Sequence, residues 1–201
     1  MSQALSIAVG VTATNFKDFL AFLHKGTEGA SYGSAGQGSL THLTMELFKQ
    51  QAKATMTHVP YRGIAPAFTD LVGGRTHAMF PGLAAALPYI RSGRIRALAV
   101  TGLTRAAQIK DVPTLEELGY KGFDAMQWYG SVGPAGIPPE IVKQLNETLG
   151  QVLKQPELRE KLAVEAVEPM PMTPQQFGEF IRKDIARWTA IAKEHGIRLD
   201  T

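Results

Sequence analysis

Residues 30–48, ASYGSAGQGSLTHLTMELF, contain the glycine-rich segment that decides the fold. Residues 30–34 have the pattern of a short strand, residues 34–39 are small, and the apolar residues that follow recur at helical spacing. A strand, a glycine loop and a helix in this order leave backbone N–H groups free at the positive end of the helix dipole. The segment therefore predicts a place for a carboxylate or a phosphate, although a plain tight turn capped by Ser39 fits the same pattern.

The loop lacks the features of two common nucleotide-binding motifs. No Lys-Ser or Lys-Thr pair follows it, so it is not a Walker loop, and the spacing of Gly33, Gly36 and Gly38 does not match the dinucleotide-binding fingerprint. Between residues 30 and 125 the chain has ten Lys and Arg residues against six Asp and Glu residues. This surplus of positive charge favours an anionic ligand in this part of the chain.

Strand-like and helix-like segments alternate on both sides of the loop. Helices are expected over 15–24, 64–72 and 83–91, and strands over 55–61, 76–80 and 95–101. Segments that alternate in this way predict an α/β fold with a parallel sheet covered on both faces. The nearly continuous apolar run of residues 95–101 is typical of a buried parallel strand.

The pattern changes beyond the last of these strands. Residues 123–132 form an aromatic, extended stretch that predicts a crossover between two lobes. A helix is expected to follow from Pro138 and Pro139. A last helix begins behind Thr173, with proline at its first position and Gln176 completing a capping box.

Composition excludes several classes of protein. The chain has 201 residues, of which 44% are hydrophobic and 19% charged, so it is expected to fold as a globular protein. Its net charge of +3, without long Lys or Arg runs, argues against a dedicated nucleic-acid binder. The absence of cysteine excludes disulfides, thiolate zinc sites and cysteine nucleophiles. No basic region precedes the apolar residues of positions 1–10, so no signal peptide is expected in this chain.

Other candidate groups lie near the loop and at two similar turns. Tyr61-Arg62-Gly63 and Phe80-Pro81-Gly82 also lead from a strand into a helix. Turns of this kind gather at the carboxyl edge of a parallel sheet, where ligands bind. His42 lies one turn inside the helix that follows the glycine loop. Trp128 could stack on a ligand at the crossover, although packing in the core is the default interpretation of such a residue.

The remaining polar residues do not predict a metal site or a catalytic triad. No pair among His42, His58 and His77 has the spacing that places two metal ligands on one helical face. Ser34 or Ser39 could act as a nucleophile, but no supporting histidine and carboxylate are evident. No catalytic residue, metal or cofactor is therefore assigned.

Several motifs in fixed order resemble one family. They are YGSAGQGS (32–39) with HL (42–43), HVPYRG (58–63) with PA (66–67), DL (70–71) with GG (73–74), RALAVT (96–101), DVPT (111–114), and GPAG (133–136) with PP (138–139). Together they resemble the substrate-binding proteins of tripartite tricarboxylate transporters, the Bug-type periplasmic receptors. The resemblance covers nearly the whole chain from about residue 16 onward.

The resemblance implies a periplasmic-binding-protein fold of type II, with two α/β lobes. Residues 30–125 would form one complete lobe that contains the glycine-loop site. Residues 1–29 would be a remnant of the other lobe, and residues 126–201 the crossover and carboxyl-terminal helices of that lobe. The chain looks truncated at its amino terminus, where family members carry a signal peptide and further ligand-contacting loops. By resemblance the protein is periplasmic.

By the same resemblance, the protein binds a small organic acid and delivers it to the membrane permease subunits of a transporter. The expected ligand-binding residues lie in the loop, its helix and the neighbouring walls: Ser34, Ala35, Gly36, Gly38, Ser39, His42, Tyr61, Arg62, Gly63, Phe80 and Trp128. One departure is Pro81, at a position where members often have an acidic or amide residue. Proline has no side-chain hydrogen-bonding group and no backbone donor.

Two other functions stay open. An enzyme could use the glycine loop to bind a phosphorylated or carboxylated substrate, and a ligand-sensing or interaction module could share the bilobal fold. No nucleic-acid partner is expected. A lobe without its covering segments would expose a sheet edge and apolar surface, and such surfaces tend to pair. This predicts a homodimer or an arrangement in which two copies exchange segments.

Overall fold

A five-stranded sheet organises the computed structural model, which describes residues 1–25 and 29–197. The strands follow the order β3-β2-β4-β1-β5. Their bounds are β1 Ala4–Ala8, β2 Ser31–Ser34, β3 Thr57–Pro60, β4 Ala78–Met79 and β5 Ile95–Val100. The expected α/β class and the expected positions of the later four strands are confirmed.

The direction of β1 corrects the expectation of a fully parallel sheet. Strand β2 runs parallel to both β3 and β4, but β1 lies between β4 and β5 and is antiparallel to both. The other four strands therefore run in one direction, and β5 reaches the sheet only through an antiparallel partner. The handedness rule for crossovers applies to parallel strands that are joined by a helix. It does not determine the direction of a strand from elsewhere in the chain that is inserted between two of them.

The position of β1 also corrects the expected boundary at residue 29. All five residues of β1 are buried, and α1 (Phe16–His24) packs on the same core, where Phe16 meets Phe48 edge to face. Nε2 of His24 lies 2.9 Å from the carbonyl oxygen of Ala52 at the end of α2 (Leu40–Ala52). Strand β1 and helix α1 thus belong to the lobe that contains the glycine loop; residues 26–28 lie outside the described residues.

Helices α3 (Ile64–Val72) and α4 (Leu83–Arg91) complete this lobe. Helix α3 contacts β1 and β2, α4 contacts β1 and β5, and α2 contacts β2. Among the described residues, the five largest fully buried side chains are aromatic: Tyr32, Phe19, Phe48, Phe80 and Phe123. The turns after β2, β3 and β4 lie at one edge of the sheet, as expected, because these three strands are parallel.

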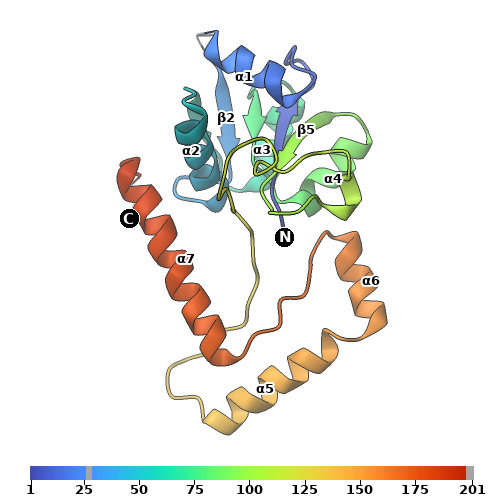
Figure 1. Ribbon diagram of the computed structural model, residues 1–201, viewed down its shortest axis with the longest axis vertical. Helices are drawn as coiled ribbons and strands as arrows, with labels where there is room; N and C mark the ends of the chain where they lie inside the picture. The colour runs from blue at the N-terminus through green and yellow to red at the C-terminus, as the bar shows by residue number, and fades with distance from the viewer. Residues whose placement is uncertain (26–28, 198–201) are drawn as a thin grey trace.

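The carboxyl-terminal part forms an open arm below the sheet (Figure 1). Helix α5 (Pro139–Val152) lies away from the lobe, α6 (Pro156–Val164) runs back toward it, and α7 (Pro174–Glu194) returns beside α2. The side-chain amide of Gln108 donates to the carbonyl oxygen of Ala163 near the end of α6. The Thr173 capping box at the start of α7 is present as expected. Helix α6 was not anticipated, because its short, charge-rich sequence has no clear apolar stripe.

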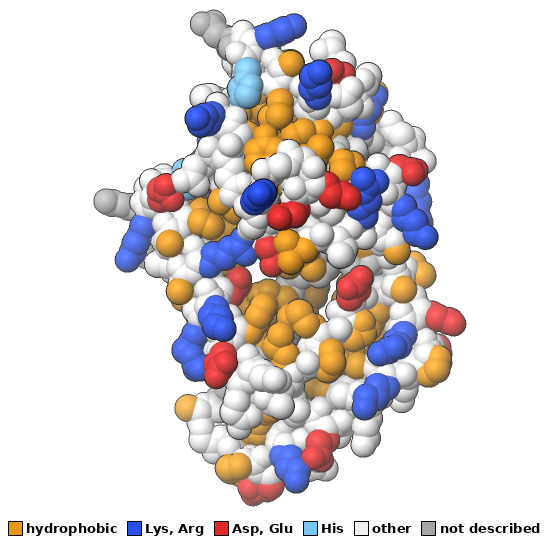
Figure 2. Space-filling model, in the orientation of Figure 1, with side chains coloured by type: hydrophobic (Ala, Val, Ile, Leu, Met, Phe, Trp, Pro, Cys, Tyr) orange, Lys and Arg blue, Asp and Glu red, His pale blue; other side chains and the backbone are white. Residues whose placement is uncertain are grey.

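The apolar side of α5 is open to solvent. Ile141, Leu145 and Leu149 are 42%, 55% and 45% exposed. Figure 2 shows apolar side chains gathered around a hollow between the lobe and this arm. Among the helices that the structure describes, none combines the length and apolar character that a membrane crossing requires.

The amino terminus lies beside the start of the crossover. The backbone N–H of Gln127 donates to the carbonyl oxygen of Met1 at 2.9 Å, and the terminal ammonium of Met1 donates to the carbonyl oxygen of Gln127 at 2.9 Å. Ser2 and Met126 form an antiparallel bridge. The crossover therefore leaves the sheet in direct contact with the segment that enters it.

Candidate functional site

The glycine loop is shaped by two glycines in the left-handed region of backbone space. Gly36 has φ +136° and Gly38 has φ +71°, values that other residues rarely adopt. A Cβ atom at Gly36 would also lie 3.2 Å from the carbonyl oxygen of Tyr61 in the neighbouring turn. The loop ends at Ser39, the N-cap of α2, whose hydroxyl accepts from the N–H of His42.

Most backbone donors expected to bind the ligand are already used inside the protein. The N–H of Ala35 donates to Oγ1 of Thr41 at 2.8 Å, and that of Gly36 donates to Oγ of Ser34 at 3.1 Å. The N–H of Gly38 donates to Nδ1 of His42 at 3.0 Å, and that of Ser39 donates to the carbonyl oxygen of Gly36. These four groups fix the shape of the loop, which corrects the expectation that they are free.

Three neighbouring donors remain available. Within residues 1–25 and 29–197, no group accepts a hydrogen bond from the N–H of Gln37, Leu40 or Thr41. Leu40 and Thr41 are the first two residues of α2, where helical N–H groups have no partner within the helix. The first turn of α2 contains no acidic residue. This helix end can accept an anion without a competing carboxylate of its own.

The turn after β3 is hydrogen-bonded to the glycine loop. The N–H of Tyr61 donates to the carbonyl oxygen of Ser34, and the N–H of Gly63 donates to that of Ala35, both at 3.1 Å. Arg62 is exposed, and no ion pair or hydrogen bond is formed by its guanidinium in the described part of the chain. The structure thus brings one unpaired cation to the turn that adjoins the loop.

The hydroxyl of Tyr61 is already hydrogen-bonded within the protein. It donates to Oδ2 of Asp70 at 2.7 Å. Burial and this hydrogen bond raise the pKa of Tyr61 to about 12. In turn, the hydrogen bonds from Tyr61 and Arg75 lower the pKa of Asp70. The Tyr61 side chain is therefore neutral and held in place next to the glycine loop.

Four other expected ligand contacts are buried or engaged elsewhere. The side chain of Phe80 is fully buried against Phe48 and Phe123, so it has no surface to offer a ligand. Ser34 is fully buried and His42 is 4% exposed. Trp128 packs edge to face on α7, and its indole N–H donates to Asp184. Burial corrects the expectation of direct contact for Phe80, Ser34 and His42, whereas contact of the half-buried Trp128 with a ligand stays a prediction.

A buried polar cluster lies directly behind the glycine loop. The rings of His42 and His58 stack with centroids 3.8 Å apart, and Nε2 of His58 lies 2.6 Å from Oγ of Ser34. Glu46 accepts from Lys49 at 2.7 Å and from the hydroxyl of Tyr32. We name this group the histidine–glutamate cluster; its members are Tyr32, His42, Glu46, Lys49, His58 and His195 of the segment after α7, whose Nδ1 lies 3.7 Å from Glu46.

Burial in this cluster favours the neutral forms of His42 and His58. Burial, with the nearby His42, lowers the pKa of His58 to about 4. Burial also lowers the pKa of His42. Burial alone would raise the pKa of Glu46, but hydrogen bonds from Lys49 and Tyr32 outweigh it and lower that pKa. Sequence patterns do not reveal this cluster, because Tyr32 and His58 come together only through the β2–β3 register.

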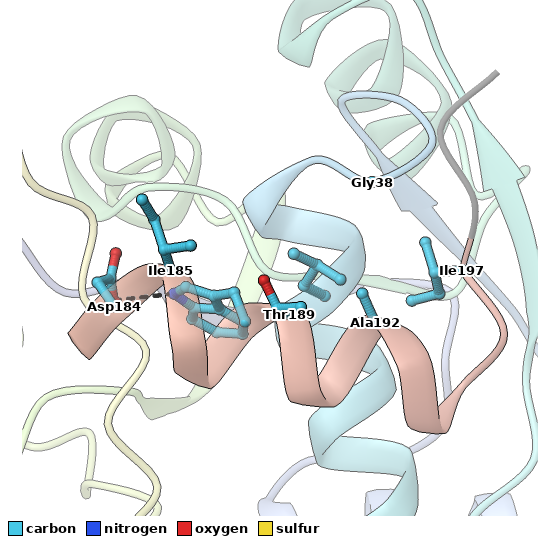
Figure 3. A pocket seen from close by; sticks show the side chains of 8 residues that line it. Gly38, Asp184, Ile185, Thr189, Ala192 and Ile197 are labelled. Carbon is cyan, nitrogen blue, oxygen red and sulfur yellow. Dashed lines mark hydrogen bonds between the residues drawn. The ribbon is translucent and has the colours of Figure 1, made fainter. Parts of the chain in front are cut away.

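A shallow groove of about 300 Å³ adjoins the loop, between α2 and α7 (Figure 3). Gly38 and Leu43 line one side, and Ile185, Trp188 and Thr189 are among the residues of α7 that line the other. No group of three or more side chains suited to a metal ion comes together among the residues that the structure describes.

The sequence also matches one protein family over almost its full length. The profile of the family described as "Tripartite tricarboxylate transporter family receptor" matches residues 2–197. The chain belongs to this receptor family. The expected family is therefore confirmed, and so is the periplasmic-binding-protein fold class of the receptor.

Relatives of the receptor include proteins of known structure. It is 37% identical to protein BugT of Bordetella pertussis over 162 residues, which is 81% of this chain and 50% of BugT. A solved structure of R. palustris Rpa4515 with adipate is similar with a TM-score of 0.90 and 34% identity, covering 98% of this chain and 66% of that one. MatC from Rhodopseudomonas palustris with bound malate is similar with a TM-score of 0.80 and 26% identity, over 95% and 66% of the two chains. The receptor chain thus spans half to two-thirds of these relatives.

Proposed function

We propose that the chain is part of a solute-binding receptor that holds a carboxylate of a small organic acid at the amino terminus of α2. The observation that carries the proposal is the set of N–H groups of Gln37, Leu40 and Thr41 that have no partner among the described residues, with the unpaired Arg62 in the turn that adjoins the loop. Structural relatives that contain adipate and malate support it, because both compounds are dicarboxylates.

The chemistry of the site suits a carboxylate oxygen. Backbone N–H groups at the start of a helix donate hydrogen bonds to an anion, and the helix dipole adds to the attraction. No charged side chain has to be buried to provide this attraction. Arg62 can donate two parallel hydrogen bonds to one carboxylate. Each hydrogen bond to a charged partner contributes about 1.5–3 kcal/mol. A second carboxylate of the ligand would need groups that residues 126–201, or chain outside this sequence, would supply.

Transport is the role proposed for this binding. The receptor would work in the periplasm and hand its acid to the membrane permease of a tripartite tricarboxylate transporter, as the family assignment suggests. We also keep the proposal that residues 126–201 belong to a second lobe. Its support is the exposed apolar side of α5, which requires a covering partner.

Binding without catalysis is favoured over the enzyme alternative. The Ser34–His58 contact of 2.6 Å resembles a nucleophile and its base. However, Ser34 is fully buried, and its hydroxyl is also bonded to the backbone of Gly36. A nucleophile in this position cannot reach a substrate.

Calorimetry with a panel of dicarboxylates tests the proposal, on this chain and on a version extended to the length of its relatives. The Leu40→Pro variant removes one free N–H at the first helical position, where proline is tolerated. The Leu40→Ala variant is the matched control, since it keeps the N–H and loses the side chain. We expect Leu40→Pro to weaken binding about tenfold and Leu40→Ala to retain most of it. If the extended protein binds no organic acid, the proposal is wrong.

A further inference from the structure

The histidine of the glycine-loop helix supports the loop from behind. Nδ1 of His42 accepts the N–H of Gly38 at 3.0 Å, so this nitrogen carries no proton. The neutral ring then has its proton on Nε2, which lies 4.0 Å from Oε1 of Glu46. Because His42 is almost fully buried, the ring itself meets the backbone of the loop and not its outer surface.

The second histidine completes this support. His58 stacks on His42 and contacts Oγ of Ser34, and that same hydroxyl accepts the N–H of Gly36. The two rings therefore fix the residues before and after Gln37, whose N–H is one of the three available donors. A change at His42 reaches the loop backbone through one hydrogen bond, and a change at His58 reaches it through two, by way of Ser34.

We propose that His42 is a positioning residue for the carboxylate site, and that its protonation at Nδ1 releases Gly38 and weakens ligand binding. The proposal rests on the proposed function, since it assigns the loop as the place of the carboxylate. A protonated Nδ1 cannot accept a hydrogen bond, so the N–H of Gly38 would face another N–H. The loop would have to change conformation to relieve this contact.

The groups that face His42 set the pH at which this happens. They are Tyr32 on β2, His58 on β3, Glu46 and Lys49 on α2, and His195 after α7. Burial is the strongest influence and lowers the pKa of His42 from its ordinary 6.5; Glu46 opposes this, while Lys49 and His195 add to it. His42 is therefore neutral at neutral pH, and the loop is intact there. Affinity should fall as the pH falls through this lowered pKa.

A matched pair of variants isolates the hydrogen bond. The His42→Asn variant places an amide oxygen near the position of Nδ1, can accept from Gly38, and does not titrate. The His42→Leu variant has nearly the same shape as asparagine and cannot accept. With adipate as the probe at pH 7.5, we expect His42→Asn to stay within about threefold of the parent and His42→Leu to lose about tenfold or more.

The pH profile separates positioning from simple charge attraction. Between pH 7.5 and 5, the affinity of the parent should fall more steeply than that of His42→Asn, which also controls for protonation of adipate itself. A positive His42 that only attracted the anion would raise affinity on acidification. That result, or equal pH profiles for the parent and His42→Asn, would overturn the proposal.

Amide exchange gives a readout that needs no ligand. The Gly38 N–H should be protected in the parent and in His42→Asn, and exposed in His42→Leu. Loss of this protection only in His42→Leu supports the positioning role of His42, whether or not adipate binds. Failure of adipate to bind would count only against the proposed class of ligand. Equal Gly38 protection in all three proteins would refute the role of His42.

Discussion

The indole N–H of Trp128 donates to Oδ2 of Asp184 at 2.9 Å, across 56 residues of sequence. The other oxygen of the same carboxylate accepts from the indole N–H of Trp188 at 3.0 Å. One aspartate on α7 thus holds an indole of the crossover and an indole of its own helix. Phe177 and Phe180 pack edge to face on Trp128 and extend this contact.

We expect the Asp184→Asn variant to loosen the attachment of α7. An amide has one accepting oxygen, so one of the two indoles loses its partner, at a cost of about 1–3 kcal/mol. Tryptophan fluorescence should shift to longer wavelength, and urea unfolding should begin earlier. Glu179→Gln, at an exposed position of the same helix, is the control. Identical unfolding curves for the two variants would show that Asp184 does not hold the crossover.

The Gly36→Ala variant should damage the loop. Its φ of +136° is strained for alanine, and a Cβ atom 3.2 Å from the Tyr61 carbonyl oxygen would force the neighbouring turn to shift. We expect a lower melting temperature and loss of dicarboxylate binding. Gly10→Ala is the control, because a Cβ there meets nothing within 4 Å. A Gly36→Ala protein that binds and melts like Gly10→Ala would contradict the loop geometry.

Acid should destabilise the fold through His58. Its pKa is about 4 in the folded state, against an ordinary value of 6.5. Between these values the unfolded chain binds a proton that the folded chain does not, so the free energy of unfolding falls as the pH falls through this range. Urea unfolding from pH 7 to pH 4.5 should show a shallower decline in His58→Gln, whose amide can still contact Ser34. A decline of unchanged slope would exclude His58 as its cause.

The exposed side of α5 should promote self-association of this chain. Lysine at both Leu145 and Leu149 would place charge in the middle of the apolar stripe and should yield monomers by light scattering. A Gln144→Lys, Gln151→Lys double variant adds the same charge on another side of the helix and should remain associated. A parent chain that is monomeric at high concentration would dismiss this expectation.

Local signals predicted the parts of the fold that depend on neighbours in sequence. The bounds expected for α3 and α4 match the structure, because glycines and a serine end these helices, and Thr173 caps α7 as expected. Strand β1 was not predicted, since five buried residues without a helical or alternating pattern do not reveal their partners. Its antiparallel direction depends on strands more than 70 residues away.

In the candidate site, too, only the features that depend on neighbours in sequence could be predicted. The loop, the helix start and the turn with Arg62 could be located from the sequence. The sequence does not reveal which N–H groups of the loop are free. Two of the loop N–H groups, those of Ala35 and Gly38, donate to the side chains of Thr41 and His42 in the first turn of the helix. The contact between His42 and His58 needs the pairing of β2 with β3, which sequence patterns alone do not register.

The attachment of the crossover has a consequence for ligand selection. Gln127 is paired with Met1, Trp128 is held by Asp184, and at Gly130 a side chain would collide with Phe177. Two residues of the crossover are thus hydrogen-bonded, one to the amino terminus and one to α7, and a third lies close to α7. We therefore expect the groove beside Gly38 to keep a fixed width, and to select the remainder of the proposed acid by its size.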